Sequence, residues 1–260
     1  MNVFRSACTP NGQVSARVRS GILTVTLIAI VVAWACRPAF LPGPVDVIHA
    51  LGRLIGDGLV YQIYVSLTTN LQAIAISCAI SLPLAYLTVL PAVRPFVRIL
   101  SKVRFLGLTG LVVIFTLAFG GGHALKLAIL VFGMTVFLLT SLNDVVEIIP
   151  REEFDYARSL RFGPWRSLYE VVILGRLDAV FDAVRQNAAM GWVLLTMVEG
   201  LVRFEGGLGA SMLAEDKHLH LDTVFALQFV VLAIGIAQDA GFVFVRRFVC
   251  PYADLTLERK

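Results

Sequence analysis

Long apolar runs alternate with short charged segments along this chain. The apolar runs cover residues 21–35, 61–90, 104–119, 124–142, 179–201 and 223–245. A helix that crosses a bilayer needs about 20 predominantly apolar residues, and most of the segments between the runs are short enough to be loops. The pattern therefore predicts an all-α membrane protein with six transmembrane helices.

The composition agrees with a protein that faces lipid. Of the 260 residues, 58% are hydrophobic and 15% are charged, whereas roughly a quarter of the residues in soluble domains are charged. An ordinary soluble domain is therefore excluded. The net charge of +4 does not indicate a nucleic-acid partner, because the basic residues cluster between apolar runs and form no stripe interleaved with aromatic residues.

The basic residues also predict the orientation. With the amino terminus in the cytoplasm, sixteen of the 22 Lys and Arg residues lie inside and five lie outside, while Arg185 falls within a span. The positive-inside rule then favours a multi-pass protein with both termini in the cytoplasm. The expected organisation is a tail at 1–20, a transmembrane domain at 21–252 and a second tail at 253–260.

The first apolar run has an alternative interpretation as a secretory signal. Arg17 and Arg19 precede it, and the residues at 33–36, Ala-Trp-Ala-Cys, loosely match a lipoprotein cleavage site. The leucine usual at such a site is missing, and further hydrophobic spans follow. We therefore favour an uncleaved first helix.

One polar segment, residues 147–178, is too polar to span the membrane and too long for a simple turn. Pro150 and the Arg-Glu-Glu at 151–153 are typical of a helix start, where the helix dipole favours carboxylates. Gly163 and Pro164 predict a break, after which a second amphipathic stretch begins. Two short helices at an angle on the cytoplasmic side suit docking by a partner protein.

This segment resembles the cytoplasmic motif of the permease subunits of binding-protein-dependent ABC importers. That motif has a Glu-Ala-Ala triplet, a glycine four residues later and a late proline. Here the triplet is Asp-Tyr-Ala at 155–157, Arg161 stands at the glycine position with Gly163 two residues on, and Leu174 stands at the proline position. The resemblance implies the type I ABC importer permease fold, with a coupling helix that contacts an ATPase. It assigns that contact to these residues: Glu153, Asp155, Tyr156, Ala157, Arg158, Leu160, Arg161, Gly163 and Trp165.

Other stretches resemble the sulfonate, taurine, nitrate and bicarbonate group of these permeases. They are the Leu-Pro-Gly-Pro at 41–44, the Leu-Pro-Leu at 82–84, Glu199 before the Gly-Gly-Leu-Gly at 206–209, and the basic pair at 246–247. The resemblance covers about residues 22–252. It implies uptake of a small anion across the bacterial inner membrane, and related permeases carry aromatic carboxylates, phosphonates or vitamin precursors.

The resemblance also implies the partners. They are two ABC ATPase subunits, a second permease subunit and a periplasmic or lipid-anchored binding protein. ATP and magnesium would be bound by the ATPase, and this chain would be a transporter subunit with no cofactor and no enzymatic activity of its own. Consistent with this, the Gly-Gly-Gly-His at 120–123 lacks the Gly-Lys-Ser/Thr ending of a phosphate-binding loop. The replaced motif residues leave open whether the second permease is a copy of this chain or a different one.

Polar side chains within the predicted spans are the candidates for the translocation pathway, because they are costly in lipid. Asn70 and Gln72 are expected mainly to hold helices together by hydrogen bonds, and Gln238 and Asp239 to face protein or the cytoplasmic boundary. Arg185 is spaced to pair with Asp182 near the cytoplasmic end of its helix. The candidate pathway residues are Asn70, Gln72, Arg185, Gln186, Asn187, Met190 and Glu199.

Glu199 is expected to cap the glycine-rich outer loop rather than to contact solute, since a carboxylate repels an anion. Metal binding is not predicted: His218 and His220 lack a third ligand at suitable spacing, and the four cysteines show no CxxC pair. No cluster of residues suggests a membrane-embedded enzyme. An ion-driven carrier, with Asp182 and Arg185 as its coupling pair, is the alternative transporter, although no internal repeat supports it.

Overall fold

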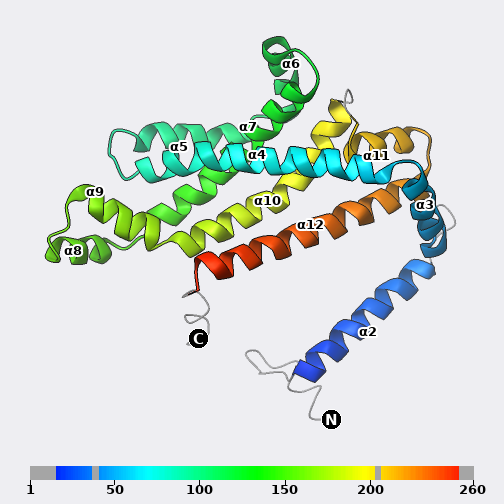
Figure 1. The fold of residues 1–260 in the computed structure, drawn as a ribbon, viewed down its shortest axis with the longest axis horizontal. Helices are drawn as coiled ribbons and strands as arrows, with labels where there is room; N and C mark the ends of the chain where they lie inside the picture. Colours follow the sequence, from blue (N-terminus) through cyan, green and yellow to red (C-terminus); the bar gives the residue numbers. More distant parts are fainter. Residues whose placement is uncertain (1–15, 37–40, 203–205, 252–260) are drawn as a thin grey trace.

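The computed structural model describes residues 16–36, 41–202 and 206–251, and all regular structure within these ranges is helical. Four long helices run side by side along the longest axis of the molecule (Figure 1). They are α4 (Leu59–Leu87), α7 (His123–Glu147), α10 (Leu177–Leu201) and α12 (Leu221–Val249). The predicted all-α class is confirmed.

Shorter helices cover the two ends of this bundle. At one end lie α3 (Pro44–Gly56) and α11 (Leu208–Lys217), and at the other lie α8 (Arg151–Ser159), α9 (Pro164–Ser167) and the π-helical turn η2 (Leu168–Leu174). The helix α5 (Arg94–Lys102) and the 3-10 turn η1 (Val103–Phe105) lead into α6 (Leu108–Phe119). Helix α2 (Ala16–Ala35) extends away from the bundle (Figure 1).

The core of the bundle lies where α4, α7, α10 and α12 meet. Its buried side chains include Ile74, Met134, Leu195 and Leu227, one from each long helix. A second cluster, with Val97 of α5 and Leu138 of α7, fills the end near α8. The outer surface of the bundle is also apolar, which is expected where lipid is the solvent.

Fewer spans are recognised than the six that the sequence predicts. Among the described residues, four helices are long and apolar enough to cross a membrane: Val18–Ala35, Leu59–Leu87, His123–Glu147 and Leu221–Val249. A fifth is obtained if the pair Arg94–Phe105 and Gly110–Phe119, bent by 112°, counts as one span.

The predicted spans at 104–119 and 179–201 account for the difference. Helix α6 has 12 residues, a length of about 18 Å that falls short of the hydrocarbon thickness, because η1 interrupts the apolar run before it. Helix α10 has 25 residues and is long enough, but it carries Asp178, Asp182, Arg185 and Glu199. Asp182, Arg185 and Glu199 are paired with Arg246, Asp239 and Lys126 in neighbouring helices.

Helix α4 continues through Pro83 and ends at Leu87. Neighbouring contacts support the helix at this point. The hydroxyl groups of Ser77 and Ser81 donate hydrogen bonds to the carbonyl oxygens of Val131 and Thr135 of α7, at 3.4 and 3.2 Å. These bonds hold α4 against α7 next to the proline, as is common in membrane helices.

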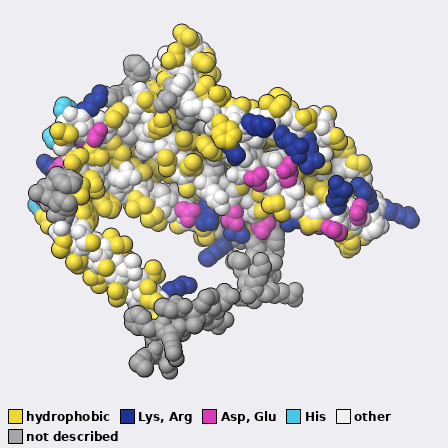
Figure 2. All heavy atoms as spheres, turned by 180° about the vertical axis from the view of Figure 1, so that it is seen from behind, with side chains coloured by type: hydrophobic (Ala, Val, Ile, Leu, Met, Phe, Trp, Pro, Cys, Tyr) yellow, Lys and Arg dark blue, Asp and Glu magenta, His cyan; other side chains and the backbone are white. Residues whose placement is uncertain are grey.

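Charged side chains are unevenly distributed over the molecule. Figure 2 shows most Lys, Arg, Asp and Glu side chains on one half of the surface, with histidines at the opposite end. The charged half carries α5, α8 and α9, and the other end carries α3 and α11. The bundle therefore has two chemically different ends separated by an apolar zone.

Candidate functional site

The polar segment between α7 and α10 folds into an elbow, which we define as α8 and α9, residues 151–167. Helix α8 starts directly after Pro150, with Glu152 and Glu153 in its first turn, and Gly163 and Pro164 mark the break before α9. The start and the break of the two predicted helices are thus confirmed. The second stretch differs in detail, since α9 is a single turn that continues as the π-helical η2.

The residue that closes α8 is Arg161, whose φ is +56°. The amide of Phe162 donates to the carbonyl of Ala157 at 3.1 Å, and the amide of Arg161 donates to that of Arg158 at 2.9 Å. This pair of bonds is a Schellman motif, which places its closing residue in the left-handed region that favours glycine. The resemblance to importer permeases sets the motif glycine at this position, and the backbone keeps the glycine conformation although the side chain is arginine.

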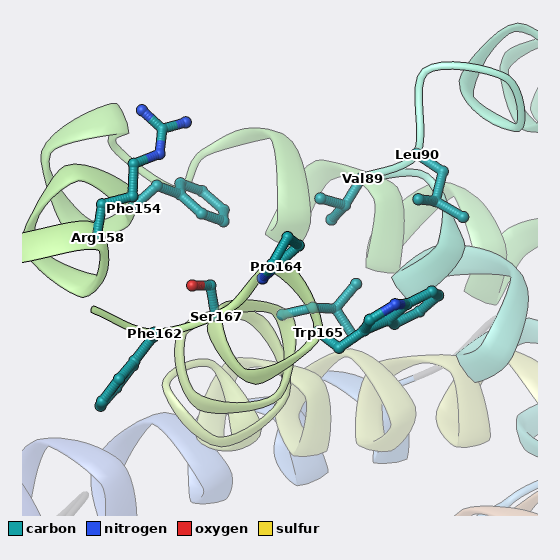
Figure 3. Close-up of a pocket in the computed structure, with 9 residues that line it drawn as sticks. Val89, Leu90, Phe154, Arg158, Phe162, Pro164, Trp165 and Ser167 are labelled. Atoms are coloured by element: carbon teal, nitrogen blue, oxygen red, sulfur yellow. The ribbon is translucent and has the colours of Figure 1, made fainter. Parts of the chain in front are cut away.

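An apolar groove of about 340 Å³ separates the elbow from the end of α4 (Figure 3). Val89 and Leu90 lie on one side of the groove, and Phe154, Pro164 and Trp165 lie on the elbow side. The aromatic side chains nearby are largely exposed: Trp165 is 69% exposed and Tyr156 is 68% exposed. An exposed aromatic surface next to a groove is typical of a protein-docking site.

Ion pairs attach the elbow to the bundle. Arg176, just before α10, contacts Glu153 of α8 at 2.5 Å. At the end of α7, the Glu147 carboxylate accepts a hydrogen bond from Arg98 at 3.1 Å and lies 3.5 Å from Arg94. These contacts tie α5 to the end of α7 from which the elbow begins. By contrast, the Asp155–Arg158 pair at 2.8 Å is exposed on α8 and leaves those side chains accessible.

A chain of alternating charges joins α10 to α12 at the charged end. Asp182 lies 3.7 Å from Arg185, as the spacing predicts, and 3.0 Å from Arg246. Arg185 in turn lies 3.4 Å from Asp239. The sequence identified Asp182 and Arg185 but missed the α12 partners, because no helical spacing relates residues in different helices.

A second polar cluster lies in the middle of the bundle. Asn70 is fully buried and donates to Gln238 Oε1 at 3.1 Å, and the indole nitrogen of Trp192 donates to the same oxygen at 3.1 Å. The Oδ1 atoms of Asn70 and Asn187 are buried without a hydrogen-bond partner in the described part of the chain. The expectation that Asn70 joins helices by hydrogen bonds is confirmed, with Gln238 as the shared acceptor.

The remaining pathway candidates lie elsewhere. Gln72 contacts His123 at 3.0 Å, at the start of α7, and does not join the Asn70 cluster. Gln186 and Met190 are exposed on α10, on the face that also shows Val193 and Met197. The open face of α10 is therefore mainly apolar, and its buried face carries Asn187.

At the other end of α10, Glu199 is the centre of a cluster that we call the glycine-loop cluster and define as Gln62, Ser66, Lys126, Glu199 and residues 206–209. Glu199 accepts hydrogen bonds from the Ser66 hydroxyl and the Gly209 amide, both at 2.9 Å. Lys126 Nζ lies 3.7 Å from Glu199 and donates to the Gly206 carbonyl at 2.9 Å. Glu199 therefore caps the glycine-rich loop, as expected.

Lys126 is one of the five basic residues that the charge count places outside. Its side chain is 0% exposed, so this charge is buried against Glu199 and does not face solvent. One feature of the sequence indicates this burial: a single charge within an apolar run needs a buried partner. Two chain segments also meet at the loop, where Gln62 Oε1 accepts the Gly207 amide and the Ser66 hydroxyl accepts the Leu208 amide.

No group of three or more His, Cys, Asp or Glu side chains with metal-binding geometry occurs among the described residues. His220 Nδ1 contacts Glu215 Oε2 at 2.7 Å, and the rings of His218 and His220 lie 5.9 Å apart. These side chains lie at the end of the bundle opposite the elbow.

Comparison with known proteins places this fold. No family model matches the chain. The bicarbonate transport system permease protein CmpB of Synechocystis sp. is 18% identical over 114 residues, which are 44% of this chain. The match spans 41% of the length of that relative.

A solved structure agrees over a longer stretch. A chain of the MetNI methionine ABC transporter, in an inward-facing conformation, superposes with a TM-score of 0.55 at 15% identity, covering 71% of this chain and 95% of the other. This protein is thus an all-helical membrane protein with the fold of an ABC importer permease. It is distantly homologous to the bicarbonate permease CmpB.

Proposed function

We propose that this chain is the membrane-spanning permease subunit of an ATP-driven ABC importer. The structure of the elbow is the observation that most directly supports this proposal. The elbow projects from the charged end of the bundle, exposes aromatic side chains beside an apolar groove, and closes α8 with the left-handed conformation that favours glycine, the residue that the importer motif has at this position. An ATPase subunit would receive the elbow, and ATP and magnesium would be bound by that subunit.

The residues of the elbow divide into two groups. Tyr156, Leu160 and Trp165 are exposed and would contact the ATPase, together with the Asp155–Arg158 pair. Glu153 and Ala157 face the protein, and with Arg161 and Gly163 they would set the shape of the elbow. Movement imposed on the exposed group would then reach α10 through the Glu153–Arg176 ion pair.

The translocation pathway would follow the open face of α10. Gln186 and Met190 are exposed there, and Asn187 and Asn70 lie behind them with unpartnered oxygens. Arg185 stands at the elbow end, where its pairs with Asp182 and Asp239 would have to rearrange when solute passes. In this proposal α10 is a transmembrane helix, its charges are held by partners, and Glu199 has a structural role. Gln72 would contribute through its contact with His123.

A small anion is the proposed solute, of the bicarbonate, nitrate, taurine or sulfonate type. The distant relative CmpB belongs to a bicarbonate transport system. Arg185 directly precedes Gln186 in α10 and would supply a cation at the proposed pathway. The alternative solutes are aromatic carboxylates, phosphonates and vitamin precursors. An extracytoplasmic binding protein would deliver the solute to a dimer of permease subunits.

The proposed orientation has the elbow in the cytoplasm and α11 outside. The basic residues of α5, α8, α9 and the end of α12 would then lie inside, in agreement with the positive-inside rule. Both termini would lie in the cytoplasm of a bacterial cell, with residues 21–252 forming the transmembrane domain around the segment 147–178.

The test is ATP-driven uptake by membrane vesicles that contain the complete transporter, with labelled bicarbonate, nitrate and taurine as probes. Tyr156→Ala and Trp165→Ala should abolish uptake and release the ATPase from the purified complex. Tyr61→Ala is the matched control, because Tyr61 is 63% exposed at the opposite end of α4. If both elbow variants kept the ATPase and full uptake, the proposal would be wrong.

Uptake by the same vesicles also distinguishes an ATP-driven importer from an ion-driven carrier. Such a carrier would continue uptake without ATP and lose it when the ion gradient is dissipated. The Asp182–Arg246 and Arg185–Asp239 pairs supply the charges that such a mechanism needs. Counting distinct permease chains by mass in the purified complex decides between a homodimer and a heterodimer.

A further inference from the structure

Most arginines of the elbow and of the segment that leads to α10 are paired with carboxylates. Arg158 and Arg166 lie 2.8 and 3.8 Å from carboxylates that are three and four residues away along the chain. Arg176 is paired with Glu153 of α8. These three positive charges are therefore neutralised within the chain.

Arg161, at the end of α8, is different. Its side chain is exposed, and no carboxylate lies within 4.0 Å of it among the residues that the structure describes. Arg151, at the start of α8, is also exposed without an ion pair, but Glu152 follows it directly. Arg161 is instead flanked by Leu160 and Phe162. Its charge therefore has no acidic neighbour in the described part of the elbow.

Arginine is also an unfavourable residue for the backbone at position 161. The φ of +56° lies in the left-handed region, where a Cβ atom is costly and glycine is favoured. Glycine would close α8 by the same Schellman motif with less strain. A residue that is held in a costly conformation, and whose side chain forms no ion pair within the described chain, points to a role in function.

The surroundings of Arg161 suit a protein partner. Tyr156, Leu160 and Trp165, all within five residues of it along the chain, are largely exposed. Figure 1 shows the elbow at the extreme end of the longest axis, past the ends of the long helices. In the proposed orientation the elbow therefore stands outside the hydrocarbon layer. Arginine and aromatic side chains are enriched at the centres of protein interfaces.

We propose that Arg161 selects the ATPase subunit, through an ion pair with an aspartate or glutamate on the surface that receives the elbow. This inference rests on the proposed function and adds the chemistry of the partner surface. The backbone of Arg161 shapes the end of α8, while its guanidinium is free to bind a carboxylate through two parallel hydrogen bonds. Charge complementarity then favours an ATPase with an acidic side chain opposite the end of α8 over one without it.

Titration of the ATPase subunit from the purified transporter against the full chain in detergent tests the proposal, with the dissociation constant as the readout. Arg161→Gly and Arg161→Ala should each weaken binding roughly 30-fold, as expected for the loss of a hydrogen-bonded charge. Arg161→Lys keeps the charge and should lose less. Arg161→Gly also relieves the backbone, so its α8 amides should be better protected against hydrogen exchange than in the unaltered chain. Weaker binding by a better-folded elbow excludes misfolding as the cause.

Arg151→Gln is the matched control, because it removes an exposed arginine from the other end of α8. It should leave the dissociation constant nearly unchanged. An equal loss for Arg151→Gln and Arg161→Gly would show that only the net charge of the elbow matters, and this would overturn the proposal. Unchanged ATPase affinity of Arg161→Gly would overturn it as well. Native mass spectrometry would then show whether the variant has lost bound phosphatidylglycerol, which would assign the charge to a membrane surface.

The failure of this proposal is distinguishable from the failure of the proposed function. If Tyr156→Ala and Trp165→Ala release the ATPase but Arg161→Gly binds it as the unaltered chain does, the proposed function stands and the role of Arg161 is wrong. If the unaltered chain binds no ATPase, both proposals are wrong.

Discussion

Lys126 and Glu199 face each other at 3.7 Å with neither side chain exposed to solvent. The lysine comes from the start of α7 and the glutamate from the last turns of α10, so the pair joins two helices at the end of the bundle away from the elbow. Each charge also holds the glycine-rich loop, through the Gly206 carbonyl and the Gly209 amide. The pair therefore fixes a loop as well as two helices.

Removing one member of this pair should be costly. Lys126→Met leaves Glu199 buried without its countercharge, and we expect a loss of about 3–5 kcal/mol in the free energy of unfolding. Lys126→Met combined with Glu199→Gln should lose less than the sum of the two single variants, because neither charge is then left alone. Thermal unfolding in detergent measures this, and additive losses would show that the two residues act independently.

Gly209 has no room for a side chain. A Cβ atom there would overlap the backbone of Thr196 in α10, so α11 and α10 approach through this glycine. Gly209→Ala should therefore lower stability by about 3 kcal/mol and loosen the glycine-loop cluster. Gly241→Ala in α12 is the control, since nothing lies within 4 Å of its added Cβ. A neutral Gly209→Ala would contradict the close approach.

The left-handed backbone at position 161 favours glycine over arginine. Arg161→Gly relieves the left-handed conformation and should stabilise the elbow by about 1 kcal/mol. Arg161→Ala removes the same long side chain but keeps Cβ, so it should give no such gain. Protection of α8 amides against hydrogen exchange reports the difference. Equal effects of glycine and alanine would indicate that the side chain, and not the backbone, matters here.

Gln238 is shared by two buried donors, the Asn70 amide and the Trp192 indole. Gln238→Leu would leave both donors without an acceptor and should cost about 2 kcal/mol. Gln186→Leu changes an exposed glutamine of α10 and should stay within about 0.5 kcal/mol. The two melting temperatures compare these costs directly. Similar values for both would mean that Asn70 and Trp192 find other acceptors.

The features that depend on local pattern could be predicted from the sequence. The apolar runs that form α2, α4, α7 and α12, the helix start after Pro150 and the break at Gly163 appear where the pattern places them. The Asp182–Arg185 pair is likewise a matter of helical spacing. Each of these features depends only on residues close together along the chain. The arrangement of the helices was predicted from the resemblance to importer permeases.

Features that depend on contacts between distant segments could not be predicted. No local pattern relates Lys126 to Glu199, which α10 brings to it, and Asp182 gains Arg246 only through the packing of α12. The division of the 104–119 run by η1 also lacked a strong signal, because Gly107 is a mild interruption in an apolar sequence. In each case the local sequence was compatible with more than one environment, and tertiary packing determined which one the residues occupy.

Helix α10 connects the two ends of the molecule, since it is unbroken from Leu177 to Leu201. Arg176 ties its start to the elbow, and Glu199, about 34 Å along, holds the glycine-rich loop. A straight helix that tilts about its middle moves its ends in opposite directions. If an ATPase drew the elbow toward the bundle axis, α10 would carry Glu199 away from that axis, with Asn187, near the centre of the helix, close to the pivot.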